Sequence, residues 1–367
     1  MGETVSARPL PTRTARQHTL RQSISCVGIG LHTGLRIRLA LHPAAENSGI
    51  LFRRVDLDGR TIPGRFDHVI DTRLSTVIGD PANPALRVAT IEHLMAALSA
   101  TGIDNVLIDV DGPELPVLDG SAADFVFLLD CAGLAEQAAP RAAIDVLRPV
   151  RVTDGDAFAE LRPAREPGLA LAMSIAFPAA AIGEQSFTAR LDRRSFRDEI
   201  ANCRTFTLRQ EIEALHAAGL ARGGSLDNAV VVDGAAILNP SGLRRPDEFV
   251  RHKMVDAVGD LYLAGATING VFTGHKSGHA LNNRLLRTLF AEAGNWRFQT
   301  RTLRPQPLRA AACSPAPVGQ RASATIRCAF SMPSRMRPSR PRPPLNRPNS
   351  ARIALKTPPW PSPRPAA

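Results

Sequence analysis

The sequence predicts an α+β protein of two modest domains, followed by a tail of different composition. About 290 residues have the mixed composition of a folded chain, which suits two domains of roughly 130 to 150 residues better than one. Both halves contain stretches with the alternation of strands and stretches with the periodicity of helices. The expected limits are a flexible N-terminus at 1–16, a first domain at 17–134, a linker at 135–142, a second domain at 143–298 and a tail at 299–367.

Each half supplies strands and at least two helices. In the first half we expect strands at 36–41 and 105–110 and helices at 91–100 and 122–131. The linker is polar and Ala-rich and contains Pro140, a composition typical of a loop. In the second half the expected strands are 146–152, 169–177 and 229–232, and the expected helices are 195–203, 209–218, 246–264 and 280–290.

The basic charge of the chain comes from its tail. Residues 1–292, with 31 basic and 34 acidic groups, have a net charge of −3, whereas the remainder has 14 basic groups, no Asp or Glu, and 15 prolines. That composition is typical of disorder or polyproline II, not of a folded basic surface. We therefore expect no nucleic-acid partner, despite a sequence pI near 10.7.

The most informative stretch is the predicted helix around 250–260, because it places polar groups on one face. His252, Asp256 and Asp260 are spaced i, i+4 and i+8, so they can face one cavity. An imidazole and a carboxylate at this spacing have the geometry of two metal ligands, although the same spacing also occurs as a solvated pair on exposed helices. A catalytic metal normally takes three protein ligands, so a third must come from elsewhere.

The best donor of a third ligand is the run from Thr90 to Leu98, an apolar helical stripe with Thr90 as its expected N-cap. His93 would lie in the first turn, beside Glu92. A carboxylate next to a metal ligand can take a proton from water without itself coordinating the metal. The alternative is an ordinary structural helix start.

A glycine-rich loop supplies two further histidines, His275 and His279, just before a helical run. If protonated, one of them could donate a proton to a leaving amine, and a carboxylate such as Asp260 would keep it charged and oriented. Spacing does not say which histidine acts, and a surface loop with two solvated histidines is the alternative.

From His18 to about Phe290, the order of seven motifs resembles the family of UDP-3-O-acyl-N-acetylglucosamine deacetylases, the zinc enzymes of the committed step in lipid A synthesis. The matching motifs lie at 28–34, 90–98, 109–121, 203–206, 223–229, 250–260 and 274–283. The resemblance implies two domains that share a fold, with their helices sandwiched between the sheets and the active site at the domain interface.

The resemblance also implies roles for individual residues in the hydrolysis of an acetamide. Three match the ligands of Zn²⁺: His93, His252 and Asp256. Four match groups that act on the reacting amide: the general base Glu92, the general acid His279, its orienting carboxylate Asp260, and Thr205, whose hydroxyl would hydrogen-bond the oxyanion. Lys253 and Lys276 match positions that face the glucosamine and diphosphate. No role is assigned to His275.

For the acyl chain, the resemblance implies an apolar channel in an insertion after Thr205. Its candidate lining residues, for each of which ordinary core is the alternative, are Phe206, Leu208, Ile212 and Val231. Phe177 is the candidate to stack on the uracil ring. Ala176 and Pro178 stand beside it where the family usually has acidic residues, which is a departure from the pattern.

The family continues past the last helix into a closing strand and then stops, whereas here the strand pattern dissolves at about Trp296. We consider three explanations for the tail: a solvated extension, a weak electrostatic tether to anionic lipid or nucleic acid, or the out-of-frame product of a coding sequence damaged near Trp296. We favour the third. A genuine tail would leave the closing strand missing or replaced.

Two other functions stay open. Two histidines and one carboxylate also describe the metal site of non-haem Fe(II) oxygenases, although that chemistry does not call for a carboxylate beside a ligand or a separate proton donor. A chain without its closing strand could instead be an inactive remnant that acts at most as a binding protein.

The sequence favours a cytoplasmic protein. It opens with no apolar signal segment, and its longest nearly apolar stretch, 169–182, is shorter than a membrane span. Five cysteines show no Cys-x-x-Cys pair, which is typical of reduced thiols. We expect a monomer that takes an acylated UDP-sugar and makes peripheral contact with the inner membrane, where such a substrate partitions.

Overall fold

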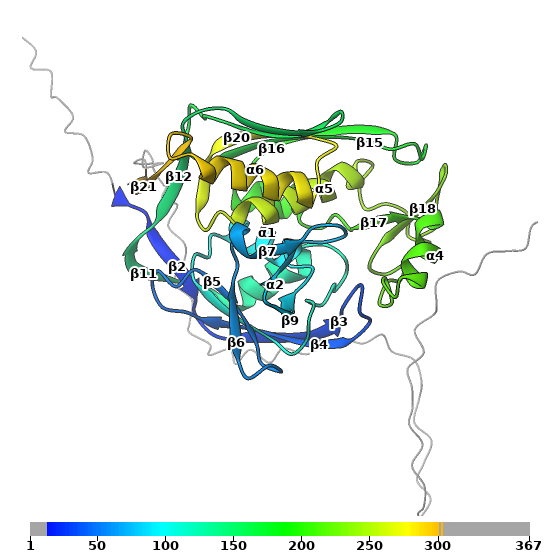
Figure 1. The fold of residues 1–367 in the computed structure, drawn as a ribbon, viewed down its shortest axis with the longest axis horizontal. Coiled ribbons are helices and arrows are strands. Elements are labelled where there is room, and N and C mark those ends of the chain that lie inside the picture. Colours follow the sequence, from blue (N-terminus) through cyan, green and yellow to red (C-terminus); the bar gives the residue numbers. More distant parts are fainter. Residues whose placement is uncertain (1–12, 301, 304–367) are drawn as a thin grey trace, which may run out of the picture. The chain divides into compact units, whose positions relative to one another are not determined.

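In the computed structural model, the described residues, 13–300 and 302–303, form two main β-sheets with helices between them (Figure 1). The predicted α+β class, with helices sandwiched between the sheets of two halves, is confirmed. No helix among the described residues is long and apolar enough to cross a bilayer.

The first half is built on a five-stranded sheet in the order β3-β4-β10-β5-β6. Alternate residues of β4, namely Ile37, Leu39 and Leu41, are buried, so one face of the sheet belongs to the core. On that face lie α1 (Glu92–Thr101) and α2 (Ala123–Ala132) (Figure 1). The strands are β3 (Ile24–Ile29), β4 (Arg36–Pro43), β5 (Ile50–Arg54), β6 (Arg60–Pro63) and β10 (Val106–Val110).

The second half is built on a seven-stranded sheet, along which β13, β14, β20, β12 and β21 follow one another, while β15 joins β20 and carries β16. Its inner face is covered by α5 (Glu248–Tyr262) and α6 (His279–Ala291) (Figure 1). The strands are β12 (Ala142–Val146), β13 (Val150–Asp154), β14 (Ala157–Arg162), β15 (Leu169–Ala176), β16 (Glu184–Arg190), β20 (Thr267–His275) and β21 (Trp296–Thr300).

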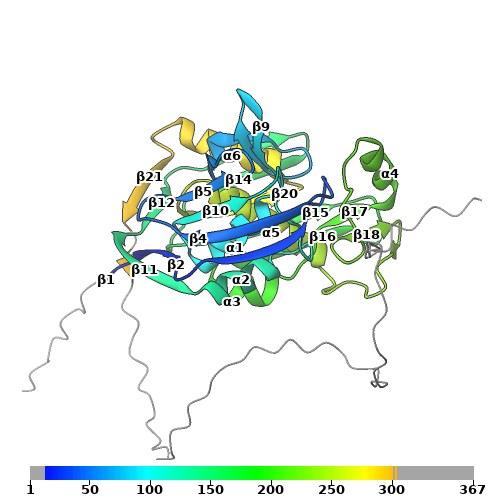
Figure 2. The same ribbon diagram turned by 90° about the horizontal axis from the view of Figure 1, so that it is seen from below.

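Each half also carries a small three-stranded sheet. In the first half it is formed by β7 (Val69–Asp71), β8 (Val77–Asp80) and β9 (Asn83–Val88), after the short helix η1 (Phe66–His68). In the second half it is formed by β17 (Phe206–Leu208), β18 (Val230–Asp233) and β19 (Ala236–Ile237), with α4 (Arg209–Ala217) beside it (Figure 2). The remaining elements are β1 (Arg13–Thr14), which pairs with β22 (Thr302–Leu303), β2 (Arg16–Leu20), and the helical turns α3 (Arg193–Ser195) and η2 (Phe196–Ile200).

The two halves meet where α1 packs against α5. At Gly259 of α5, an added Cβ would lie only 2.0 Å from the carbonyl oxygen of Glu92 on α1. No side chain fits in that space, so glycine is what allows the two backbones to touch. This contact sets the distance between the two helices that carry the predicted metal ligands.

Three local predictions differ from the structure. The predicted linker is not a loop: residues Leu134–Pro140 form β11, which pairs antiparallel with β2. The strand expected at 146–152 is two strands, β12 and β13, separated at Pro149, which has no amide hydrogen for a continuous ladder. The helix expected at 195–203 is the pair α3 and η2, which ends at Ile200.

The closing strand is present. β21 pairs antiparallel with β12, from Trp296 opposite Val146 to Thr300 opposite Ala142, so the strand pattern does not dissolve at Trp296. Within the flexible N-terminus expected at 1–16, residues 13–14 form β1 and Arg16 begins β2; within the tail expected at 299–367, residues 299–300 end β21 and 302–303 form β22, so these parts are strands. The rest of both segments, and with it the three explanations for the tail, lies outside the described residues. The domain limits stay a prediction.

Candidate active site

Helix α5 places His252, Asp256 and Asp260 in the buried interior, as their spacing predicts. The carbonyl oxygen of Cys203 lies 3.0 Å from His252 Nδ1, which assigns the proton to that nitrogen and leaves Nε2 free to accept. His252 Nε2 is 3.4 Å from Asp256 Oδ1. Burial lowers the pKa of His252 to about 4, so the ring is neutral, as a metal ligand must be.

Helix α1 brings His93 to the same point from the other half of the molecule. His93 Nε2 lies 3.7 Å from Asp256 Oδ1, and its ring meets that of His252 edge-on, with centroids 5.0 Å apart. The ligand atoms of His93, His252 and Asp256 all lie within 4.8 Å of one another. Two imidazoles and one carboxylate at this separation fit a divalent metal ion that keeps a position for water.

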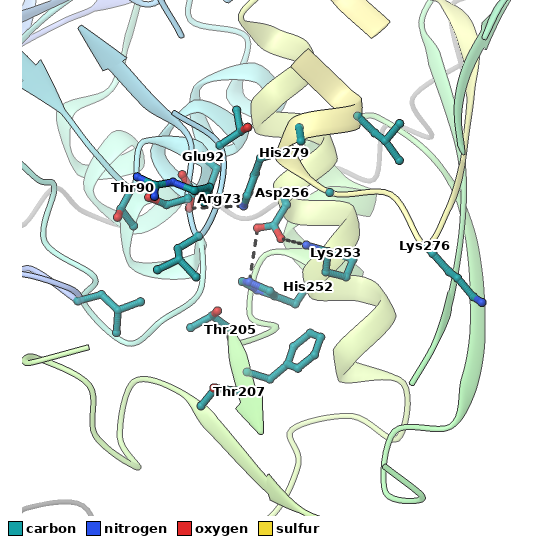
Figure 3. Close-up of a pocket in the computed structure, with 18 of the residues that line it drawn as sticks. Arg73, Thr90, Glu92, Thr205, Thr207, His252, Lys253, Asp256, Lys276 and His279 are labelled. Carbon is teal, nitrogen blue, oxygen red and sulfur yellow. Dashed lines mark hydrogen bonds and ion pairs between the residues drawn. The ribbon is translucent and has the colours of Figure 1, made fainter. Parts of the chain in front are cut away.

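Lys253 supports this cluster. Its ammonium donates a 2.9 Å hydrogen bond to Asp256 Oδ2, the oxygen that faces away from the two histidines (Figure 3). Burial alone would raise the pKa of the Asp256 carboxyl, but Lys253 and the histidines outweigh it and hold the pKa well below its usual range. The carboxylate is therefore ionised and available as a ligand.

A second cluster, Glu92, His279 and Asp260, lies beside the three ligands. His279 Nδ1 is 2.9 Å from Asp260 Oδ2, and His279 Nε2 is 3.9 Å from Glu92 Oε1. Burial raises the pKa of Glu92. Burial would lower the pKa of His279, but the carboxylate of Asp260 outweighs it and raises that pKa to about 9. A carboxylate base and a protonated imidazole therefore stand together in one site.

A cavity of about 520 Å³ opens onto both clusters (Figure 3). It contains six further residues predicted from the sequence: Thr205, Lys253, Lys276, Phe177, Phe206 and Leu208. Ile212 lines a neighbouring cavity of about 510 Å³ instead, next to Leu31 and Leu215. Val231 is fully buried and lines neither cavity, so it belongs to the core.

The structure distinguishes between the two loop histidines and shows whether Thr90 caps α1. His275 bonds to the Ser174 hydroxyl and does not line the cavity, so His279 is the histidine that reaches it. Thr90 is not the N-cap: its φ is +57°, its hydroxyl donates to Glu114 Oε1, and α1 begins after Ile91 without a side-chain cap. Thr90 therefore stands one position before the N-cap, with a left-handed backbone, and its hydroxyl bonds to Glu114 and not to the first amides of the helix.

The sequence alone does not point to several residues of the site. His32, Arg73 and Leu74 line the cavity, and Thr76 and Asn282 hydrogen-bond to Asp260. His32 stands in the glycine motif at 28–34, a match that gives the histidine no role. The bond from Thr76 to Asp260 joins positions 184 apart, so no local pattern points to it.

Residues 17–291 match the model of the family described as UDP-3-O-acyl N-acetylglycosamine deacetylase. The chain belongs to this family. The deacetylase of Phenylobacterium zucineum (strain HLK1) is 51% identical over 286 residues, which cover 77% of this chain and 96% of that relative. The deacetylase of Acidithiobacillus ferrooxidans (strain ATCC 53993 / BNL-5-31) is 49% identical over 284 residues, covering 77% and 92%. That of Idiomarina loihiensis (strain ATCC BAA-735 / DSM 15497 / L2-TR) is 49% identical over 288 residues, covering 78% and 93%.

The region that matches the deacetylase family contains every residue of the two clusters, from Glu92 to His279. It ends at residue 291, before β21 and before the basic tail. The likeness to this deacetylase family therefore concerns the two sheets and the helices between them.

Proposed function

We propose that the chain removes acetate from UDP-3-O-acyl-N-acetylglucosamine in lipid A biosynthesis, in the cytoplasm and with zinc as its metal. The observation that carries the proposal is that one cavity holds three metal-ligating side chains together with a separate buried base and acid. Amide hydrolysis needs both an activated water and a proton for the leaving nitrogen. The names of the relatives supply the substrate.

The donor set supports zinc. Two imidazoles and one carboxylate with a position left for water are typical of catalytic zinc sites. When bound, Zn²⁺ would lower the pKa of a water molecule and polarise the acetamide carbonyl. The chain prepares its ligands for this: the Cys203 carbonyl orients His252, and the Lys253 ammonium orients Asp256.

In the proposed reaction, Glu92 takes the proton from the attacking water. Its carboxylate sits next to His93 in sequence yet outside the ligand set, and burial raises its pKa toward the range of a useful base. His279 then protonates the departing nitrogen from Nε2, while Asp260 holds Nδ1. Thr205, which lines the same cavity, is proposed to donate its hydroxyl to the oxyanion.

Substrate contacts are proposed for the remaining lining residues. Lys253 and Lys276 supply positive charge near the glucosamine and the diphosphate of the substrate. Phe206 and Leu208 line the 520 Å³ cavity and Phe206 also the neighbouring one, so the acyl chain would run past them toward Ile212. Phe177, also in the cavity, would stack on uracil; its ring already meets Phe206 edge-on, with centroids 5.4 Å apart.

We also propose that the monomer contacts an anionic membrane at the rim of a third cavity, of about 740 Å³, which shares Leu74 with the 520 Å³ cavity. Leu35, Ile70 and Leu74 on this rim are 51%, 37% and 47% exposed. The charged residues that line the cavity are three arginines and two acids, namely Arg73, Arg87, Arg222, Asp71 and Glu114. Apolar side chains among cations suit a bilayer with acidic lipids.

Sedimentation with vesicles tests the membrane contact. Phosphatidylcholine vesicles containing phosphatidylglycerol should bind the chain, and Leu35→Asp should weaken that binding. The matched control is Phe127→Asp on α2, which is 66% exposed and lines none of these cavities. Equal binding by wild type and Leu35→Asp would refute the contact, and light scattering in the same buffer would test the monomer.

Acetate release from UDP-3-O-acyl-N-acetylglucosamine tests the proposed reaction. The full chain should release acetate, and should do so equally without dioxygen, which separates it from an Fe(II) oxygenase. Release should stop with a chelator and return with Zn²⁺. A full chain that folds and binds zinc but releases no acetate would leave the inactive binding protein as the better account.

A further inference from the structure

Thr76 lies where the base and the acid of the proposed site meet. It precedes β8, only 1% of its surface is exposed, and its carbonyl oxygen accepts a bond from the Ile91 amide at the start of α1. Its own amide donates to Glu92 Oε2 at 3.0 Å. The backbone of Thr76 is therefore tied to the same helix start that carries the base.

The side chain of Thr76 reaches the other half of the molecule. Its hydroxyl donates to Asp260 Oδ1 at 2.5 Å. Asp260 Oδ2 accepts from His279 and from the Asn282 amide, both at 2.9 Å. Both oxygens of Asp260 are thus held, and a carboxylate held at both ends cannot rotate away from His279.

We propose that Thr76 is a positioning residue that couples the two proton-transfer groups, holding Glu92 through its amide and the Asp260–His279 pair through its hydroxyl. The inference rests on the proposed function, because positioning matters only if Glu92 and His279 move protons. It predicts that the hydroxyl of Thr76 contributes to the rate of the chemical step and not to substrate or metal binding.

The alternative is that Thr76 merely fastens the small β7-β8-β9 sheet to α5. A merely structural bond would change stability and substrate binding and would leave kcat almost unchanged. A positioning bond would change kcat alone, and its loss would cost nothing once its acceptor is gone.

Thr76→Val tests this, because valine keeps the shape and the amide but removes the hydroxyl. In the zinc-loaded full chain we expect kcat to fall about 10- to 100-fold, the range typical for partners that orient a catalytic group. KM and zinc content should stay within about twofold, and Thr76→Ser should restore most of the rate. The matched control is Thr101→Val on α1, whose buried hydroxyl donates only to the helix carbonyls of Ala97 and Leu98 and should leave kcat unchanged.

A double-mutant cycle with Asp260→Ala completes the test. Adding Thr76→Val to Asp260→Ala should cause no further loss of kcat. An equal loss in both backgrounds, or a loss shared by Thr101→Val, would overturn the inference, as would an unchanged kcat in Thr76→Val.

If wild type releases acetate and Thr76→Val matches it, the inference fails and the proposed function stands; if wild type releases none, both fail. Should Thr76→Val not fold, Thr76→Ala removes the same hydroxyl and gives the same comparison in the two backgrounds. An unchanged kcat in Thr76→Ala would then be the contradicting result.

Discussion

The two sides of the cavity are built in different ways. On the side proposed for proton transfer, Glu92, Asp260 and His279 are 4%, 2% and 9% exposed, and each has partners that fix its orientation. On the side proposed for the substrate, Lys276 stands on an outer loop and extends away from the metal ligands (Figure 3). Its side chain is 33% exposed and pairs with Asp156, which is 72% exposed. The groups proposed for proton transfer are thus held in place by the fold, whereas Lys276 is partly exposed and pairs with an exposed carboxylate. Substitutions at the two places should therefore have different effects.

The largest effect should come from the proposed metal ligands, because the metal ion would both activate the water and polarise the acetamide carbonyl. His252→Ala should lose bound zinc and about 10³-fold or more in activity, since a metal supplies several kcal/mol of transition-state stabilisation. Metal content by mass spectrometry and acetate release check this. His275→Ala, a nearby histidine outside the cavity, serves as the control and should keep both. Full activity in metal-free His252→Ala would contradict the metal site.

Glu92→Gln should have the next largest effect, since it removes the base and keeps the shape of the side chain. General base catalysis is typically worth about 10²- to 10⁴-fold, so kcat should fall by that order. KM and zinc content should not change, because Glu92 is not in the ligand set. Steady-state kinetics at saturating zinc measure this, and a rise in KM at constant kcat would assign Glu92 to the substrate side instead.

Asp260→Asn should move the pH dependence of the reaction. His279 must be protonated to act as the acid, so activity is lost as the pH rises through its pKa of about 9. Burial lowers the pKa of His279, and the carboxylate of Asp260 raises it. In Asp260→Asn that carboxylate is gone, so the effect of burial is opposed more weakly and the pKa of His279 falls. The basic limb of the kcat profile should therefore shift to lower pH, with a rate loss of about 10- to 100-fold at pH 8. An unmoved basic limb would show that another group titrates there.

Lys276→Ala should have the smallest effect and should act on binding. An exposed ion pair is worth about 0.2 to 1 kcal/mol, so KM should rise no more than about fivefold, with little change in kcat. The rise should shrink at high salt, because exposed charges are screened. Substrate titrations at two ionic strengths measure it. A large loss of kcat would place Lys276 with the buried groups.

The sequence predicts the parts of this site that depend on local periodicity. The helix with His252, Asp256 and Asp260 begins within two residues of its predicted start, because its apolar stripe and its polar row are properties of the helix itself. His93 and Glu92 are found for the same reason. The resemblance to the family was needed to join these segments into one site, because spacing alone does not bring α1 to α5.

What the sequence does not predict depends on partners far along the chain. The sequence around Thr76 gives no sign of a role, because its partners Glu92 and Asp260 are brought to it only by the fold. The linker prediction fails because β11 is defined by its pairing with β2, more than a hundred positions away, and not by its own Ala-rich composition. Thr90 has the side chain of a cap, but its left-handed backbone places it before the helix start, and its hydroxyl bonds to Glu114, 24 positions away. In each case a contact between distant segments overrides the local preference.

The contact at Gly259 also affects the spacing of the proposed metal ligands. His93 belongs to one half of the protein and His252 and Asp256 to the other, and the two helices that carry them touch where Gly259 faces the Glu92 carbonyl. Any change that separates the helices there also lengthens the gap between His93 and Asp256. In the proposed site, the affinity for the metal should therefore also depend on how closely the two halves pack, and a distant substitution that loosens their packing should weaken metal binding.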